Sequence, residues 1–180
     1  MPRILAIDWD RHEVRGLLVS AGATGTTVTG AWVASLATAE PNGLSGKQLG
    51  SRLATAAAGK ISGKVTTLVG VGRHNVQIKL LSLPPAPPEE LPDLVRFPAG
   101  REFTALGADA ALDYIPLSGD AATPNQVLAL ALNAAGVAEA REICEALDVE
   151  AGRIEVRGCA AAAFATRAAS IAAEEIALIV

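Results

Sequence analysis

The first 35 residues contain three apolar, strand-like runs joined by connections too short to hold a helix. The runs cover residues 3–8, 14–20 and 26–33, with a polar cluster and a glycine-rich turn between them. A crossover between parallel strands needs about a dozen residues or more, so these short connections require antiparallel neighbours. The segment is therefore predicted to form a three-stranded antiparallel meander, with Val28 and Trp32 on one face of its third strand.

A helix and a buried strand are expected next. Ser45 followed by Gln48 has the form of a capping box, in which each side chain bonds the other residue's backbone N–H. Apolar residues recur at helical spacing as far as Ile61, and Gly63 is expected to end the helix. Residues 65–71 are mostly apolar, which is typical of a central strand covered on both faces.

From residue 74 the expected order changes to strand, helix, strand, strand, helix, strand. The strands are 76–80, 112–117, 126–132 and 153–156, and the helices are 89–103 and 136–147. This is the split βαβ order of a ferredoxin-like unit. A rigid proline run at 83–88 precedes the first of these helices. Pro92 and Pro98 are expected to divide that helix into short pieces, each with a proline in its first turn.

An alanine-rich helix at 159–173 and a strand-like run at 176–180 end the sequence. Because domains rarely stop on an uncapped apolar strand, the natural chain is expected to continue. The simplest organisation is an α/β domain of residues 1–73 and 158–180, with a ferredoxin-like unit of residues 74–157 inserted in it.

The composition argues against several classes of protein. The 180 residues include 15 Lys and Arg against 19 Asp and Glu, without a basic cluster, so no nucleic-acid partner is expected. Cys144 and Cys159 are too few for a disulfide framework or a four-cysteine zinc site, and reduced, mostly buried thiols are expected. No metal-ligand spacing surrounds the two histidines, His12 and His74, so no metal site is expected.

Membrane insertion is not expected either. The longest apolar stretches, such as residues 127–132, are far shorter than the ~20 residues of a spanning helix. Asp8 and Asp10 interrupt the apolar run at the N-terminus, which is therefore not a signal peptide. The chain is expected to stay in the compartment where it is made.

Several passages, taken in order, resemble one family. Residues 7–15 are similar to the first phosphate-binding hairpin of actin-like proteins, usually apolar-Asp-apolar-Gly followed by small or polar residues, an apolar residue and Lys or Arg. Residues 78–94 run from a strand through Leu-Pro-Pro into an acidic helix, and a Leu-Asp-Tyr strand follows at 112–114. With the strand at 126–132 and the alanine-rich helix carrying Arg167, this order resembles the N-terminal half of the type IV pilus assembly protein PilM family.

The resemblance implies an actin-like (ribonuclease H-like) subdomain with an inserted βαββαβ subdomain of the kind shared with the cell-division protein FtsA. It implies a cytoplasmic protein held at the inner face of the inner membrane by partners. Such a protein would dock the N-terminal cytoplasmic peptide of a PilN-like protein in type IV pilus or type II secretion assembly. It would bind Mg-ATP between two lobes; with the second lobe beyond residue 180, no cofactor is expected for this chain alone.

The resemblance assigns phosphate binding to Asp8, Asp10, Arg11 and His12. Asp8 would organise Mg²⁺ and its waters, or would simply cap the hairpin turn. Asp10 stands where the family usually has glycine, and Glu13 adds a second charge nearby. Two like charges about 5 Å apart repel by roughly 3 kcal/mol at an effective dielectric near 20, which costs over about a hundredfold in binding. Unless Mg²⁺, Arg11 or His12 offsets this, ATP binding is expected to be weak or lost.

Three functions follow from these observations. The first is a binding scaffold, the second an actin-fold ATPase or small-molecule kinase whose second lobe is missing, and the third a filament former that self-associates. No serine has the surroundings of a nucleophile elbow, so no catalytic residue is predicted and an enzyme is not favoured. The impaired phosphate motif favours the scaffold.

Overall fold

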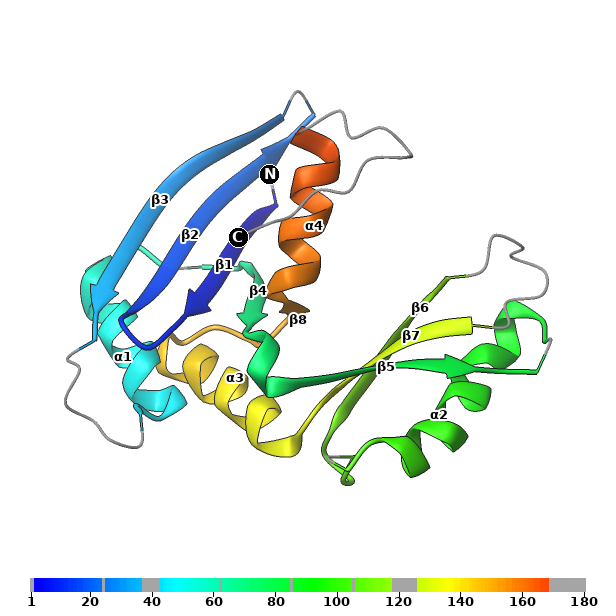
Figure 1. The fold of residues 1–180 in the computed structure, drawn as a ribbon. Coiled ribbons are helices and arrows are strands. Elements are labelled where there is room, and N and C mark those ends of the chain that lie inside the picture. Colours follow the sequence, from blue (N-terminus) through cyan, green and yellow to red (C-terminus); the bar gives the residue numbers. More distant parts are fainter. Residues whose placement is uncertain are drawn as a thin grey trace. The chain divides into compact units, whose positions relative to one another are not determined.

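The computed structural model describes residues 2–23, 25–36, 43–61, 63–84, 86–104, 106–117 and 126–168. The chain forms two compact units (Figure 1). The first unit consists of Met1–Arg73 and Glu139–Val180, and the second unit of His74–Ala138. Among the described residues, no helix is both long and apolar enough to cross a membrane.

The first unit is built on a five-stranded sheet with the order β3-β2-β1-β4-β8. Its strands are β1 (Arg3–Trp9), β2 (Glu13–Gly22), β3 (Gly25–Ser35), β4 (Thr66–Val71) and β8 (Arg153–Val156). The first three pair antiparallel, while β4 and β8 join in parallel. The predicted meander is confirmed, and so is the inner position predicted for the strand at 65–71.

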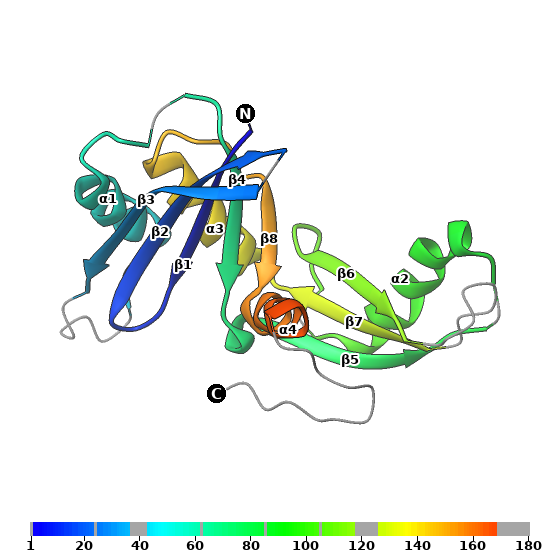
Figure 2. The same cartoon turned by 90° about the horizontal axis from the view of Figure 1, so that it is seen from above.

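Three helices cover this sheet. α1 (Gly46–Ala57) and α3 (Ala134–Ala146) lie on one face, and α4 (Arg157–Ala168) lies on the other (Figure 2). The predicted capping box is confirmed, because Ser45 Oγ accepts from Gln48 N at 3.3 Å and Gln48 Oε1 accepts from Ser45 N at 2.9 Å. The apolar side chains between the sheet and the helices α1 and α3 form the first core, which includes Leu5, Ile7, Val14, Leu53, Val69 and Ile143.

A β-bulge overturns the prediction that Val28 and Trp32 share a face of β3. Leu18 pairs with Gly30 and Val19 pairs with Val28, so the intervening Thr29 has no partner in the register. The extra residue inverts the alternation of side chains along the strand. Trp32 packs against the first core, whereas the side chain of Val28 is 58% exposed.

The second unit is a three-stranded antiparallel sheet with one helix. Its strands, in the order β5-β7-β6, are β5 (Val76–Ser82), β6 (Ala111–Pro116) and β7 (Gln126–Leu132). Short 3₁₀ turns, η1 (Arg73–Asn75) and η2 (Pro88–Glu90), precede β5 and α2 (Leu91–Glu102). α2 packs on one face of the sheet and forms the second core, which includes Leu81, Leu91, Val95, Phe103 and Val127.

The prediction that prolines divide this helix is half wrong. Pro92 lies in the first turn of α2 as predicted, but Pro98 lies inside a continuous helix. An interior proline removes one helical hydrogen bond and costs about 3 kcal/mol. Val95 and Ala99, on either side of Pro98, are completely buried, so packing of α2 against the sheet outweighs that cost.

The predicted extent of the inserted unit, 74–157, is wrong at its second boundary. The predicted unit and the observed unit both begin after Arg73. The observed unit ends at Ala138, whereas the predicted one ends at residue 157. The strand predicted at 153–156 pairs with β4 of the first sheet, and Ile143 of α3 packs in the first core. The inserted unit therefore has the described order β-α-β-β rather than βαββαβ. The strand predicted at 176–180 lies outside the described residues.

Candidate functional site

Both the backbone and the carboxylate of Asp10 form hydrogen bonds within the turn between β1 and β2. Asp10 N donates to Glu13 O at 3.0 Å, which closes the hairpin. Asp10 Oδ1 accepts from the backbone N–H groups of His12 at 2.7 Å and Glu13 at 3.1 Å. Adjacent turn amides of this kind form a concavity that binds anions. In this hairpin the anion on the amides is the protein's own side chain.

The electrostatic environment of Asp10 stabilises its charged form. The hydrogen bond from the His12 N–H is the largest cause that lowers the pKa of Asp10, and the Glu13 N–H and the Arg15 guanidinium act in the same direction. Desolvation opposes them. Asp10 is consequently a firmly ionised group at neutral pH.

Arg15 joins three carboxylates of the hairpin. Its Nη1 lies 2.6 Å from Asp8 Oδ2, its Nε lies 2.5 Å from Glu13 Oε1, and its Nη2 bonds Asp10 Oδ2. The sheet register places Asp8 directly opposite Arg15, where cross-strand pairs interact. The hydrogen bond to Glu13 is the largest cause that raises the pKa of Arg15.

A second guanidinium reaches this network from α4. Arg157 Nη2 lies 2.6 Å from Asp8 Oδ1 and donates to the backbone carbonyl of Trp9. Within the described part of the chain, Asp8 Oδ1 has no hydrogen-bond partner of good geometry, so this contact is an ion pair. Gly70 of β4 pairs with Asp8 of β1 in the sheet register. A Cβ on Gly70 would lie 3.3 Å from Asp8 Oδ1. The missing side chain leaves room beside the carboxylate.

The four residues predicted to bind a cofactor fall into two groups. Asp8 and Asp10 lie in one network, joined through Arg15. Arg11 and His12 have exposed side chains, and neither has an ion pair among the described residues. Among the described residues, the carboxylates are therefore paired with Arg15 and Arg157, and not with Arg11 or His12, the two groups that the sequence analysis named as able to offset them.

The sequence alone predicted neither the roles of Arg15 and Arg157 nor the contact of Glu13 with Arg15. Side chains alternate between the two faces of a strand. This alternation in β2 could have placed Arg15 on the same face as Asp8, had the hairpin register been known. Arg157 could not be found in this way, because it depends on β8 joining the first sheet. The carboxyl ends of the parallel strands β1, β4 and β8 meet at one edge, which brings the start of α4 to Asp8.

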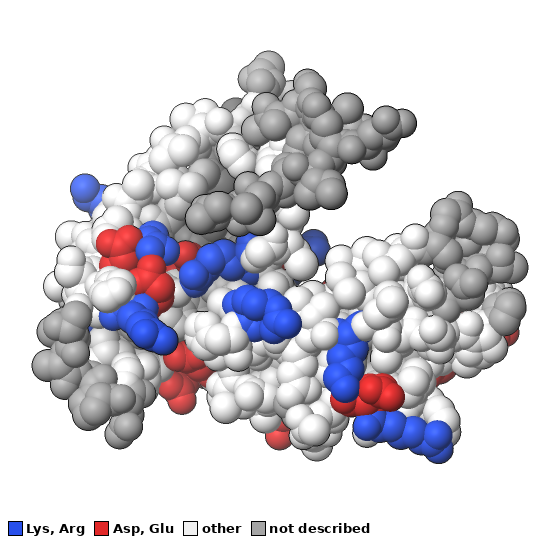
Figure 3. All heavy atoms as spheres, viewed as in Figure 1, with Lys and Arg blue, Asp and Glu red and all other residues white. Residues whose placement is uncertain are grey.

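Chemically, the cluster is an ion-pair network in which two guanidinium groups, of Arg15 and Arg157, bind the three carboxylates of Asp8, Asp10 and Glu13. Acidic and basic side chains are interspersed on this part of the first unit (Figure 3). Both guanidinium groups are bound to carboxylates, and the turn amides already hold Asp10. Over the described residues, no group of His, Cys, Asp or Glu side chains is arranged to hold a metal ion. Cys144 is buried and Cys159 is half-buried, and both are free thiols as expected.

One face of the second unit's sheet carries aligned apolar side chains. Leu80 pairs with Leu128, which pairs with Ile115, so the three residues form a row across β5, β7 and β6. Leu80 is 55% exposed and Ile115 is 45% exposed. α2 packs on the other face, where Leu81 and Val127 enter the second core. We call Leu80, Leu128 and Ile115 the apolar row.

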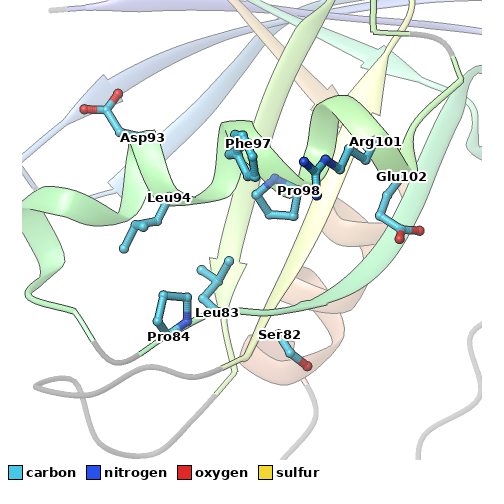
Figure 4. Close-up of a pocket in the computed structure, with 9 residues that line it drawn as sticks. All are labelled: Ser82, Leu83, Pro84, Asp93, Leu94, Phe97, Pro98, Arg101 and Glu102. Carbon is cyan, nitrogen blue, oxygen red and sulfur yellow. The ribbon is translucent and has the colours of Figure 1, made fainter.

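A shallow groove lies on the α2 side of the second unit. It has a volume of about 540 Å³ and runs between α2 and the segment after β5 (Figure 4). Leu83, Pro84 and Leu94 give it an apolar floor. Phe97 at its rim lies under the Arg101 guanidinium, 4.5 Å from the ring centroid. This cation–π contact already covers part of the exposed ring.

The likeness to known proteins lies in the fold. No family model matches the sequence, and no curated protein matches it either. A chain of the "PilM-PilN type IV pilus biogenesis complex" superposes with a TM-score of 0.73 and 18% identity, over 93% of this chain and 51% of that chain. The cytoplasmic domain of EpsL, an inner membrane component of the type II secretion system of Vibrio cholerae, superposes with a TM-score of 0.56 and 10% identity, over 84% and 56%.

These superpositions define the class of fold. The α/β fold of PilM type that the sequence predicts is confirmed, with the five-stranded sheet as its framework. At such identities the likeness extends to the fold alone. The chain spans about half the length of both matched chains.

Proposed function

We propose that this chain is a binding scaffold in type IV pilus or type II secretion assembly. It docks the N-terminal cytoplasmic peptide of a PilN-like inner-membrane protein, and so acts at the inner face of the inner membrane. The observation that carries this proposal is the half-exposed apolar row on the face of the second unit's sheet opposite α2. The fold likeness to a chain of the PilM-PilN complex supports the same reading.

The apolar row has the properties of a peptide-docking surface. Leu80 and Ile115 each expose about half of their side chain, with Leu128 between them. Fully burying one such side chain contributes about 1.5–3 kcal/mol, so covering the exposed halves of two contributes roughly 2 kcal/mol. A short peptide with apolar side chains would gain this stabilisation, and backbone or polar contacts would add to it.

Nucleotide is not needed for this function. We propose that this chain binds no Mg-ATP, and that a longer protein containing it would bind Mg-ATP weakly at most. A phosphate at the β1–β2 turn would have to displace Asp10 from the amides of His12 and Glu13. Arg15 and Arg157 would have to leave their carboxylates to meet it. The alternative function, an actin-fold ATPase or small-molecule kinase, requires both changes.

Photocrosslinking in the source cells tests the docking proposal. A benzoylphenylalanine residue in place of Leu80 should crosslink to the N-terminal cytoplasmic peptide of an inner-membrane protein, identified by mass spectrometry. The same residue in place of Phe97, exposed on the α2 side of the same unit, is the matched control and should give no such product. Crosslinking from position 97 alone would move the docking site to the groove. Absence of a crosslinked peptide at both position 80 and position 97 would refute the proposal.

A further inference from the structure

β3 is a long and unprotected edge of the first sheet. It pairs with β2 on one side, and no described strand lies on its other side. Exposed edge strands usually carry lysines, prolines or other charged residues that prevent pairing with another chain. Residues 25–35 contain no charged residue and no proline. The bulge at Thr29 disturbs only the first half, so residues 30–35 form a regular edge.

The backbone groups along this edge point outward in a regular pattern. Leu36 N donates to His12 O at 2.6 Å, which fixes the direction of hydrogen bonding at this end of β3. Because directions alternate along an antiparallel strand, the N–H and C=O groups of Ala31 and Val33 point away from β2. Among the described residues, none pairs with them.

The side chains beside the edge are apolar and exposed. Val33 is 56% exposed, and Leu17, which pairs with Ala31 in the neighbouring strand, is 40% exposed. These side chains lie on the face opposite the first core, because Trp32 packs into that core. The edge therefore offers hydrogen-bonding groups and apolar surface together.

We propose that β3 pairs antiparallel with β3 of a second copy of this chain, so that one sheet continues through a dimer. Under twofold symmetry, Ala31 of each copy meets Val33 of the other, and each such pair exchanges both backbone hydrogen bonds. The pairing is centred on these residues because the Ser35 carbonyl already accepts from Arg52 Nη1 at 3.4 Å.

The chemistry of the edge favours a second copy over another partner. Identical neutral strands meet without the like-charge repulsion that charged edges would suffer. A charged partner would find no complementary charge along β3, and the nearest charges on this face, Glu13 and Arg15, are bound to each other. The proposal is independent of the apolar row, which lies on the second unit.

Sedimentation equilibrium of this chain and of three variants tests the proposal. At concentrations up to about 500 μM, the wild type should approach twice its mass of 18.3 kDa. Val33→Lys should raise the dissociation constant of the dimer at least about tenfold, because it places two ammonium groups at the centre of the contact. Val33→Thr keeps an uncharged β-branched side chain and should dimerise like the wild type. Leu80→Lys changes the apolar row and should also leave the dimer intact.

Three outcomes would overturn the proposal. A wild-type chain that stays monomeric has no such pairing. A dimer that survives Val33→Lys, or that is lost in Leu80→Lys instead, uses another surface. Circular dichroism and thermal melting must show that Val33→Lys is folded, because the register places position 33 directly opposite Arg15 and a lysine there adds a like charge. If that variant unfolds, Ala31→Pro replaces it, since the outward N–H of Ala31 is not needed within the sheet.

Discussion

At the scale of single residues, the carboxylate of Asp10 occupies the position that a bound anion occupies in a phosphate-binding hairpin. This carboxylate accepts hydrogen bonds from two turn amides and forms an ion pair with Nη2 of Arg15. The sequence indicated that Asp10 would repel phosphate. The structure adds that Asp10 fills the position itself, which sequence reasoning could not establish because the Asx turn depends on the backbone path.

Removing this carboxylate should create an anion site. In Asp10→Gly, the amides of His12 and Glu13 become free, and the repulsion of roughly 3 kcal/mol disappears, so binding of inorganic phosphate should strengthen by about a hundredfold. Isothermal titration calorimetry of this chain with inorganic phosphate measures the change. Asp10→Asn is the control, because its amide oxygen keeps both hydrogen bonds and the site stays filled. Equal binding by all three proteins would mean that the turn is not an anion site.

Glu139 provides a prediction about pH. Burial is the main cause that raises the pKa of Glu139, and the nearby Glu142 charge raises it further. The folded state thus binds a proton more strongly than the unfolded state, and this contribution to stability is lost as pH rises through the folded pKa. Glu139→Gln should therefore be more stable than the wild type at pH 7 and lose that advantage at acidic pH. Urea denaturation at several pH values measures it; a constant difference would contradict the assignment.

At the scale of elements, α1 packs on α3 through glycines. A Cβ on Gly50 would lie 2.5 Å from the carbonyl oxygen of Ile143 and 2.7 Å from the Cβ of Ala146. The two helices can approach this closely only because position 50 has no side chain. This contact belongs to the first unit and joins segments far apart in the sequence.

Substituting two helix glycines, Gly50 in α1 and Gly100 in α2, should give opposite results. Gly50→Ala should lower the free energy of unfolding by about 1–3 kcal/mol, because the new methyl group overlaps α3. Gly100→Ala in α2 should raise it by up to about 1 kcal/mol, because no described atom outside the local helix backbone would lie within 4 Å of the new Cβ and alanine favours the helix. Guanidinium denaturation monitored by circular dichroism compares them. A stabilising Gly50→Ala would contradict the described packing of α1 on α3.

Elements that depend on local sequence could be predicted, and those that depend on distant neighbours could not. The meander and the capping box follow from short connections and from the spacing of Ser45 and Gln48. The bulge at Thr29 has no local signal, and the 153–156 strand could have joined either sheet. Assigning it to the inserted unit moved the second boundary and hid the approach of Arg157 to Asp8.

At the scale of the whole molecule, the first unit carries an ion-paired hairpin and the second unit carries the apolar row. The ion-paired hairpin supports the proposal that nucleotide is not required, and the apolar row supports the proposal of a peptide partner. Because the chain spans about half of each matched chain, both statements about the complete protein are proposals. They share one consequence, which is that peptide binding should not depend on Mg-ATP.

Fluorescence anisotropy of a labelled peptide tests this consequence most directly. The peptide is the cytoplasmic N-terminus that position 80 captures, titrated with the protein in the presence and absence of Mg-ATP. The account predicts saturable binding with the same dissociation constant in both conditions, weakened about tenfold or more in the Leu80→Ser, Ile115→Ser double variant. Absence of saturable binding, or a dissociation constant that Mg-ATP changes by about tenfold or more, would contradict it.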